Sequence, residues 1–104
     1  MEPISEMAEH LKLLSDKTRL TVLAYLKERA LCVCDIVELM ETSQPNISQH
    51  LRKLKAAGIV NETRKGQWIY YSLSIENKPY IQELLQHLPS LKEQIDQLKN
   101  CCDS

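Results

Sequence analysis

The sequence lacks the features that mark several large classes of protein. No apolar run approaches the roughly 20 residues that a membrane-spanning helix needs, and residues 1–6 are acidic and carry no apolar export signal. No Ser-His-Asp grouping, phosphate-binding loop or carboxylate pair indicates catalysis, and there is no internal repeat or low-complexity segment. These absences predict a cytoplasmic protein that is not an enzyme and has no membrane partner.

Cysteine is scarce: the 104 residues contain only Cys32, Cys34, Cys101 and Cys102. Cytoplasmic thiols stay mostly reduced, so a fold held together by disulfides is not expected. Thiolates are soft donors that prefer thiophilic ions to Mg²⁺ or Ca²⁺, which makes all four cysteines candidate metal ligands. Two alternatives stay open. Cys32 and Cys34 can be small buried packing residues, and Cys101 and Cys102 can be redox-sensitive thiols or have no role.

Acidic residues are almost missing from one part of the chain. The net charge is −1 overall, but residues 43–72 hold five basic residues and one acidic residue, or +4, while the remainder carries −5. A basic region on an acidic protein is the pattern expected of a compact DNA-binding protein. A chain of this length forms one domain, residues 1–104, with a modest core, so stabilisation by dimerisation is plausible.

Residues 43–58 are predicted to form a capped helix. Ser43 can accept a hydrogen bond from a first-turn amide, and Pro45 fits the first turn because its missing N–H costs little there. Gly58 can supply the left-handed residue that ends a helix. One narrow apolar stripe repeats at helical spacing and consists of Ile47, Leu51 and Leu54.

The outer face of this helix is rich in amides, hydroxyls and basic groups, with no acid between Ser43 and Asn61. Amides and arginine match base edges in the major groove of DNA, so we interpret it as a recognition helix. At about 100° per residue, Gln49 and Arg52 lie nearly opposite the apolar stripe. The alternative is an ordinary solvated face. The candidate DNA contacts are Ser43, Gln44, Asn46, Ser48, Gln49, Arg52 and Lys53.

Three helices are predicted before the recognition helix. Residues 3–14 have amphipathic spacing, and Ser15-Asp16 caps a second helix that runs to about Arg29. A short third helix follows, and a tight turn at Glu41-Thr42 leads into the recognition helix. A short helix, a tight turn and a polar helix form a helix-turn-helix motif. The apolar face of the third helix consists of Val33, Ile36, Val37 and Met40.

After Gly58 the apolar period changes from 3.6 to 2, which predicts a β-hairpin over residues 59–73 with a Lys65-Gly66 turn. The side chains expected to face the core are Ile69, Tyr71 and Leu73, with Trp68 and Tyr70 on the other side. A basic hairpin after a recognition helix is a wing that can touch phosphate or the minor groove; the alternative is a plain solvated turn. The wing adds three candidate DNA contacts: Arg64, Lys65 and Gln67.

Residues 77–100 are predicted to form a dimerisation helix. Pro89 predicts a kink or two successive helices, the second capped by Ser90. The apolar seam is longer than so small a core requires, so we expect a homodimer surface shared with the first helix. The alternative is packing within one chain. The seam repeats at intervals of 3 and 4, as in a coiled coil, and consists of Ile81, Leu84, Leu88, Leu91, Ile95 and Leu98.

Five motifs occur together and in order: LLSDKTRL from Leu13, LCVCDI from Leu31, SQPNISQHL from Ser43, AGIV from Ala57 and GQWIYYSL from Gly66. With this combination, residues 4–75 resemble the ArsR/SmtB family of metal-responsive transcriptional repressors. The resemblance implies a mainly α-helical winged helix-turn-helix with a β-hairpin wing, dimerised through its first and last helices. It also implies binding to double-stranded operator DNA and repression of a detoxification operon, relieved by a toxic ion.

The resemblance also narrows the choice of ion. The Leu-Cys-Val-Cys-Asp box is similar to that of arsenic- and cadmium-type sensors, and the terminal His and Asp pattern of zinc sensors is expected to be absent. Arsenic sensors of the family use three thiolates, but Val37 stands where some have a third cysteine. A third ligand is therefore expected from Cys101 or Cys102, of either chain, or from a small thiol. Arsenite or antimonite is the favoured inducer, with cadmium, lead or zinc as alternatives.

Release from DNA is predicted to depend on the helix that carries Cys32 and Cys34. On an ideal helix, positions two residues apart diverge by about 200°, so the two sulfurs could not hold one small ion. Binding would then unwind the first turn of this helix and shift residues 44–53 against the groove, so ion and operator would favour different states. No histidine is assigned to the metal, and His50 is expected to pack or to hydrogen-bond.

Three other functions remain compatible with these residues. The same cysteines could make a repressor of this fold respond to thiol oxidation or persulfides. The fold could bind proteins instead of DNA, although the acid-free helix argues against this. A Cys-x-Cys pair could also serve a thiol-disulfide enzyme, but such an enzyme needs an exposed thiol of low pKa in a supporting site, and no thioredoxin-like strand pattern is present.

Overall fold

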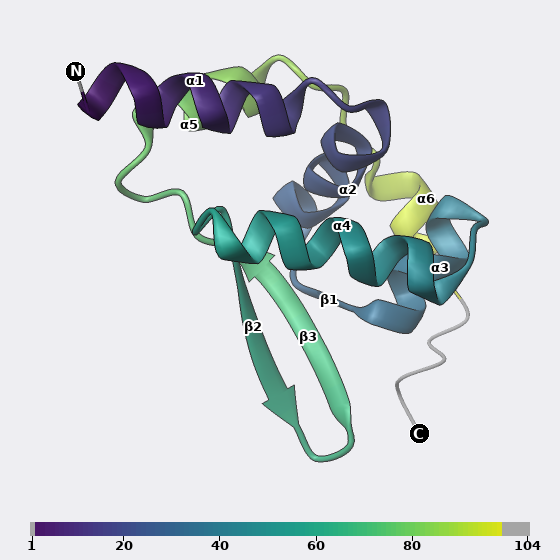
Figure 1. Ribbon diagram of the computed structural model, residues 1–104. Coiled ribbons are helices and arrows are strands. Elements are labelled where there is room, and N and C mark those ends of the chain that lie inside the picture. The colour runs from purple at the N-terminus through teal and green to yellow at the C-terminus, as the bar shows by residue number, and fades with distance from the viewer. Residues whose placement is uncertain (1, 99–104) are drawn as a thin grey trace.

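The computed structural model describes residues 2–98, which form six helices and three short strands (Figure 1). None of the helices within this range is long and apolar enough to span a membrane. The elements in chain order are α1 (Glu2–Leu14), α2 (Lys17–Glu28), β1 (Leu31–Cys32), α3 (Val33–Met40), α4 (Gln44–Ala56), β2 (Val60–Lys65), β3 (Trp68–Leu73), α5 (Pro79–Gln86) and α6 (Lys92–Asp96).

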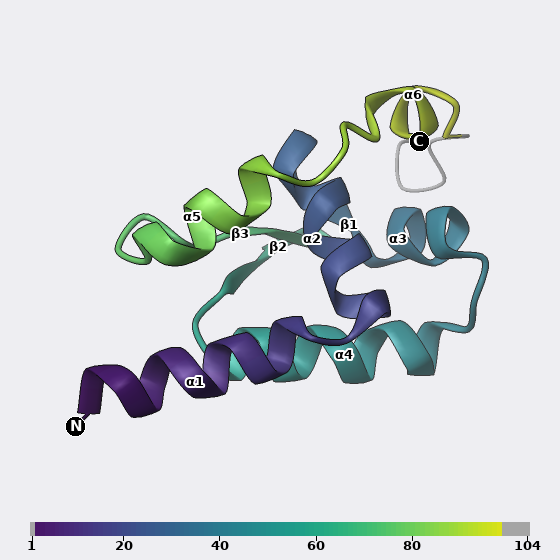
Figure 2. The same ribbon diagram turned by 90° about the horizontal axis from the view of Figure 1, so that it is seen from above.

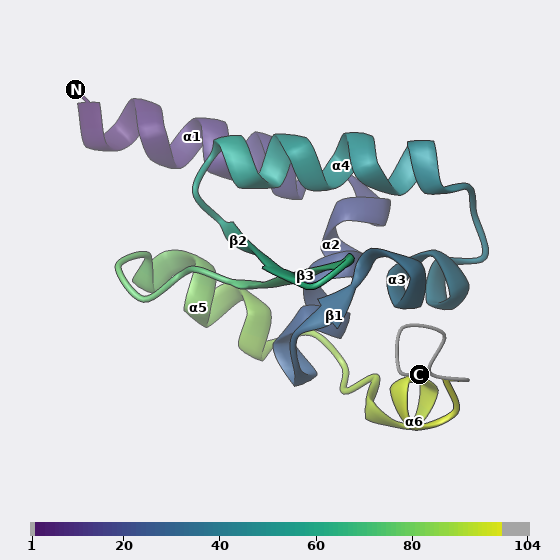
Figure 3. The same ribbon diagram turned by 90° about the horizontal axis from the view of Figure 1, so that it is seen from below.

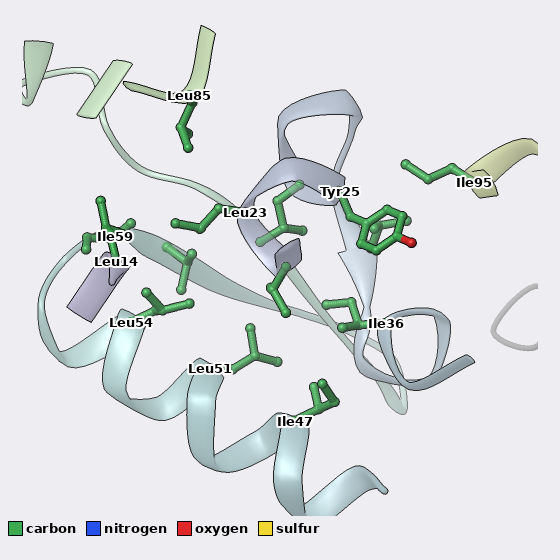
Figure 4. Close-up of a cluster of buried hydrophobic side chains, with 14 of the residues drawn as sticks. Leu14, Leu23, Tyr25, Ile36, Ile47, Leu51, Leu54, Ile59, Leu85 and Ile95 are labelled. Atoms are coloured by element: carbon green, nitrogen blue, oxygen red, sulfur yellow. The ribbon is translucent and has the colours of Figure 1, made fainter. Parts of the chain in front are cut away.

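Helix α2 lies in the middle of the molecule, with α4 on one side and α5 on the other (Figure 2). Its residues 22–26 are all buried, as expected for a helix that is covered on every side. Helix α4 contributes its predicted apolar stripe, Ile47, Leu51 and Leu54, to the same core, and these three side chains have no exposed surface (Figure 4). The core around α2 therefore holds α4 by its apolar face, and the polar face of α4 points away from the core.

The start of α2 and both ends of α4 have the capping residues that the sequence predicts. The Asp16 carboxylate accepts a hydrogen bond from the Arg19 backbone N–H at 3.0 Å, and the Ser43 hydroxyl accepts one from the Asn46 N–H at 3.3 Å. Gly58 has φ +75°, and the Ile59 N–H closes the end of α4 onto the Leu54 carbonyl at 3.0 Å. This is the closure of a helix by a left-handed glycine, so the predicted caps are confirmed.

Helices α3 and α4 are joined by a turn of three residues (Figure 3). Glu41 ends α3 in the left-handed region, with φ 53°, and its N–H donates to the Val37 carbonyl at 2.9 Å. A left-handed conformation outside glycine costs about 1 kcal/mol, so the tight turn is held against some strain by the packing of the two helices. The helix-turn-helix motif predicted from the sequence is present.

The three strands form one antiparallel sheet in the order β1-β3-β2. The hairpin of β2 and β3 projects away from the helices (Figure 1). Lys65 pairs with Trp68, so the turn consists of Gly66 and Gln67, one residue later than predicted. Gly66 has φ +61° and supplies the positive φ that a tight hairpin turn needs at its first central position.

Strand β1 was not anticipated from the sequence, because two residues are too short to show a period. Leu31 pairs with Tyr71 and Cys32 with Tyr70, which attaches the first cysteine directly to the wing. The pattern of facing along β3 is also only partly as expected. Tyr71 and Leu73 pack against the core, whereas Ile69 lies farther along the projecting hairpin, where the core no longer reaches, and all six residues of β3 are half-buried.

Residues 77–98 contain two short helices, α5 and α6, which is one of the two arrangements that Pro89 predicted. The Lys27 ammonium donates to the carbonyls of Leu85 and Leu88 at 3.3 and 3.0 Å and so covers the end of α5. The expected cap at Ser90 is wrong: the residue before α6 is Leu91, without a side-chain cap, and the Ser90 hydroxyl donates to Glu28 at 3.2 Å.

The break between α5 and α6 changes the role of the apolar seam. Once the chain bends after Pro89, the seam turns back onto α2, and Ile81, Ile95 and Leu98 are buried in the chain's own core. The other members are half-buried against that core: Leu84, Leu88 and Leu91. Part of the seam therefore packs within the chain, and the homodimer surface expected from it stays a prediction.

Candidate DNA interface and thiolate site

The outer face of α4 carries most of the predicted DNA contacts in an accessible position. Five of the seven are exposed: Ser43, Gln44, Gln49, Arg52 and Lys53. Asn46 and Ser48 are half-buried, and the Asn46 amide nitrogen donates to the Thr42 hydroxyl at 3.2 Å. Asn46 therefore helps to hold the turn before α4, and one of its hydrogen-bonding groups is already used within the protein.

His50 links the recognition helix to the rest of the molecule. Its Nδ1 lies 3.1 Å from the Arg19 guanidinium, whose Nε also donates to the Leu13 carbonyl at 2.7 Å. Arginine can only donate, so His50 accepts here with its unprotonated nitrogen. The expectation that His50 hydrogen-bonds is confirmed, and α4 is connected through Arg19 to the end of α1.

The tip of the wing holds the remaining predicted contacts. Arg64, Lys65 and Gln67 are all exposed. The Lys65 ammonium lies 5.2 Å from the centre of the Tyr70 ring, within the range of a cation–π contact. At the base of the hairpin, Glu62 pairs with Lys55 of α4, and this hydrogen bond raises the pKa of Lys55 above its ordinary value. The pair ties the wing to the recognition helix.

Cys32 and Cys34 lie together at the start of α3. Cys32 is extended, with φ −82° and ψ 165°, and precedes the helix as its N-cap residue, while Cys34 is in the first turn. Their sulfurs are 3.0 Å apart, farther than the roughly 2.05 Å of a covalent S–S bond. Cys32 is buried and Cys34 is half-buried. The prediction that the two sulfurs diverge by 200° is wrong, because only one of the two residues is helical.

This geometry removes the need to unwind the helix. An ion about 2.3 Å from each sulfur, at a tetrahedral angle, needs the sulfurs about 3.8 Å apart. The pair must therefore open by only roughly 1 Å, starting from 3.0 Å. Rotation of two side chains can supply this movement.

Asp35 is a third possible ligand that the sequence reasoning did not name. One carboxylate oxygen of Asp35 and the two sulfurs all lie within 4.8 Å of one another, and the aspartate is only 8% exposed. The signal was available, because an acid directly follows the Cys-x-Cys pair in the Leu-Cys-Val-Cys-Asp box. The other two predicted ligands, Cys101 and Cys102, lie outside the described residues.

A pocket of about 220 Å³ lies beside the two cysteines. Its walls come from the end of β1, the start of α3, the first residue of α4 and the wing. The lining residues are Cys32, Val33, Cys34, Gln44, Gln67, Trp68 and Ile69. A small ligand can therefore reach the thiols from outside, and it would meet both DNA-facing elements on the way.

Comparisons with known proteins agree with this architecture. Residues 16–62 match the model of the family described as bacterial regulatory protein, arsR family. Over 76 residues, or 72% of this chain and 59% of the relative, the sequence is 43% identical to the arsenic resistance transcriptional regulator ArsR1 of Pseudomonas putida. It is 38% identical to the CadC homologue of Staphylococcus aureus, a cadmium resistance transcriptional regulatory protein, over 79% of this chain and 69% of the relative.

Among solved structures, the fold is similar to the homodimeric winged helix-turn-helix DNA-binding domain of a possible ArsR-family transcriptional regulator from Mycobacterium bovis. The TM-score is 0.73 at 26% identity, over 82% of this chain and 79% of that one. The chain spans between 55% and 66% of the length of the arsenic resistance regulators of P. putida and Escherichia coli that it matches. Both the sequence and the winged helix-turn-helix fold thus lead to the same group, and the chain belongs to the ArsR family of bacterial regulatory proteins.

Proposed function

We propose that this protein is a homodimeric transcriptional repressor that leaves its operator when a thiophilic ion binds Cys32 and Cys34. The observation that carries the proposal is the 3.0 Å contact between the two sulfurs at the junction of β1 and α3. Because β1 pairs with the wing and α3 precedes the recognition helix by three residues, a change at the thiols acts on both elements that would touch DNA.

The proposed DNA contacts fall into two groups. Gln44, Gln49 and Arg52 carry amide and guanidinium groups that can read base edges in the major groove. The basic residues Lys53, Arg64 and Lys65 contact phosphates and add affinity without reading sequence. Ser43, Asn46, Ser48 and Gln67 complete the proposed interface, as phosphate or base contacts at its edges.

The proposed dimer is built on α1. Its side chains Ile4, Met7 and Leu11 are 63%, 37% and 48% exposed and lie at helical spacing on one face. A monomer gains nothing from an exposed apolar stripe, whereas a second copy can bury it. The M. bovis relative named above is described as homodimeric, which supports this assembly. Two copies would place two recognition helices on half-sites about one turn of DNA apart.

The proposed release follows from competition between two states of one junction. In the metal-free state the thiols lie together, and α3 and α4 keep the arrangement that fits DNA. An ion would hold the sulfurs farther apart than the 3.0 Å of the metal-free state. We infer that the rotated side chains of Cys32 and Cys34 then press on the wing and on the turn before α4, and so favour a second arrangement that fits DNA less well. Coupling between two such sites is typically about 1–3 kcal/mol, or 5–150-fold in operator affinity.

The third ligand decides which ion is preferred. A carboxylate oxygen from Asp35 would complete a set that suits divalent ions such as cadmium, lead or zinc, whereas a third sulfur would suit arsenite or antimonite. The third sulfur can come from Cys101 or Cys102 of either chain, or from a small thiol. We favour arsenite or antimonite as the inducer, and the position of Asp35 is the observation that supports the divalent alternative.

Fluorescence anisotropy with a labelled duplex from upstream of the protein's own gene tests the proposal. Each ion is titrated into the preformed complex with wild type, Cys32→Ser, Cys34→Ser, Asp35→Asn and the double variant Cys101→Ser/Cys102→Ser. We expect arsenite to release the wild type and to fail with either single cysteine variant. Asp35→Asn should weaken the response to cadmium more than the response to arsenite.

The tail variant removes two thiols elsewhere in the chain and so tests whether Cys101 or Cys102 supplies the third sulfur. Normal arsenite-driven release of Cys32→Ser or Cys34→Ser would contradict the proposal. If only the tail variant lost its response, the ion site would have to lie at the C-terminus instead.

A second candidate, a repressor that responds to thiol oxidation, draws on the same 3.0 Å contact, because a disulfide could form between neighbouring thiols with little rearrangement. Mass spectrometry after exposure to an oxidant separates the two. Loss of two hydrogens from the peptide that contains Cys32 and Cys34, together with loss of DNA binding in the absence of any ion, would favour the redox reading.

A further inference from the structure

The pocket beside Cys32 and Cys34 is not used by the ligands named so far. Its volume of about 220 Å³ is far larger than a bare ion, and falls below the 300–1,000 Å³ typical of sites for drug-sized ligands. A water occupies about 30 Å³ in the liquid, so the space suits one organic molecule of modest size.

The walls of the pocket are mixed in character. Val33, Trp68 and Ile69 supply apolar surface, while Gln44 and Gln67 supply amide groups at its edge. Among residues 2–98, the one further ligand atom found close to both sulfurs is a carboxylate oxygen of Asp35. Oxygen is a harder donor than trivalent arsenic or antimony prefers. Cys32 and Cys34 both line the pocket, and the half-buried Cys34 is the more accessible of the two.

We propose that this pocket binds a short thiol, of about the size of cysteine, as the third ligand of an arsenite or antimonite ion held by Cys32 and Cys34. The inference rests on the proposed function and adds the identity of the third donor and its place. The body of the thiol packs on Val33, Trp68 and Ile69, and its polar groups meet the two glutamines.

The reaction balances without a redox change. Arsenous acid carries three hydroxyl groups, and the two protein thiols and the free thiol each give up one proton. Three As–S bonds form, three As–O bonds break, and three waters leave. Arsenic stays trivalent throughout, so no oxidant or reductant is required.

The place of the thiol also extends the path by which the ion acts on DNA binding. Gln44 is the first residue of α4, and Trp68 is the first residue of β3. A thiol wedged between them would separate the start of the recognition helix from the outer part of the wing. The inducer is then the ion together with its thiol, and the bare ion acts less strongly.

Trp68 is the only tryptophan in the chain, so its fluorescence reports directly on this pocket. Arsenite is titrated into the full-length protein in a phosphine reductant that carries no thiol, then again with cysteine, 2-mercaptoethanol or the bulkier glutathione added at equal concentration. Native mass spectrometry records the mass of each complex. We expect a short thiol to tighten arsenite binding by roughly tenfold or more, to change the Trp68 emission and to appear in the mass of the complex.

Two variants separate the pocket from the ion site. Ile69→Phe narrows the pocket and should remove most of the gain from the thiol, while arsenite alone still binds Cys32 and Cys34. Tyr70→Phe, the next residue along β3, does not line the pocket and serves as the matched control, with the full gain expected. Thermal unfolding of both variants checks that they fold.

The outcomes distinguish this inference from the proposed function. If arsenite binds with the same affinity and the same mass in every buffer, the thiol subsite is wrong and the ion-sensing repressor stands. If the extra thiol appears in the complex of the tail variant Cys101→Ser/Cys102→Ser but not of the wild type, the tail supplies the third sulfur in the native protein and the inference is again overturned. If no arsenite binds at all, both proposals fail.

Discussion

Helices α3 and α4 lie next to each other and begin in opposite ways. At the start of α4, the Ser43 hydroxyl accepts a hydrogen bond from the helix. At the start of α3, Cys32 has the same extended backbone but makes no side-chain cap hydrogen bond, and its sulfur lies against Cys34 instead. An N-cap hydrogen bond is worth about 1 kcal/mol, so Ser43 stabilises the start of α4 in a way that the Cys32 side chain does not stabilise the start of α3.

The two helix starts differ in how readily we expect them to move. Both helices are anchored in one core, through Ile36 and Ile47, which have no exposed surface. Movement is therefore expected at the first turn of α3, where the side chain of the N-cap residue is committed to a thiol contact and not to the backbone. The four predictions below test this contrast.

The largest effect should come from removing the two anchors. Ile36→Ala and Ile47→Ala each leave a cavity in a fully buried site, and each should lower the free energy of unfolding by about 2–5 kcal/mol. Urea denaturation followed by circular dichroism measures both. Exposed Glu38→Ala is the control and should change little. A much smaller loss for Ile36→Ala than for Ile47→Ala would mean that α3 is loose along its whole length and that the contrast is not confined to its start.

The next effect concerns the exposed face of α4 and should appear in DNA binding alone. Arg52→Ala should weaken operator binding by about 1–3 kcal/mol and relax the preference at one base position, while Lys53→Ala should weaken binding to all sequences and lower the salt slope by about 1. Anisotropy titrations at several salt concentrations measure both. Lys92→Ala on α6 is the control; an equal loss there would point to a bulk charge effect.

The third effect sets the two N-cap residues against each other. Ser43→Ala should lower the free energy of unfolding by about 1 kcal/mol, because it removes a cap. Cys32→Ser places a good capping residue in a backbone conformation that suits it and should leave stability unchanged or slightly higher. Thermal unfolding of the metal-free proteins compares them. A loss from Cys32→Ser as large as that from Ser43→Ala would show that the thiol contact itself stabilises α3.

The smallest effect uses α2, whose cap is a carboxylate. The hydrogen bond from the Arg19 backbone N–H holds the pKa of Asp16 below its ordinary value. Because the folded state binds the proton less readily, this contribution to stability is present above the unfolded pKa and is lost as the pH falls through the lowered folded value. Asp16→Asn keeps a capping group but should show a shallower loss of stability below about pH 4. Identical acid denaturation of the two proteins would contradict the assignment.

Much of the fold could be predicted because its signals are local. The Ser43 and Asp16 caps, the Gly58 helix end and the stripe of Ile47, Leu51 and Leu54 are each written within a few residues. A cap acts over three residues and an amphipathic stripe over one helix, so neither depends on the rest of the chain.

What the sequence left undecided has a different cause. The seam from Ile81 to Leu98 has the spacing of a dimer surface, but spacing alone does not show how much of the seam packs on the chain's own core. At the thiol site, Cys32 and Cys34 look like two positions of one helix until β1 pairs with β3 and holds Cys32 extended. That pairing joins residues about 40 apart in sequence, and no local pattern encodes it.

Residue type and period are enough to predict a winged helix-turn-helix with an acid-free outer helix and a Cys-x-Cys box. The contact between the two sulfurs, the position of Asp35 beside them and the pocket between the recognition helix and the wing are visible only in the folded chain. Those features arise from side chains brought together by the core and the sheet, whose distances depend on long-range packing and not on the order of residues along the chain.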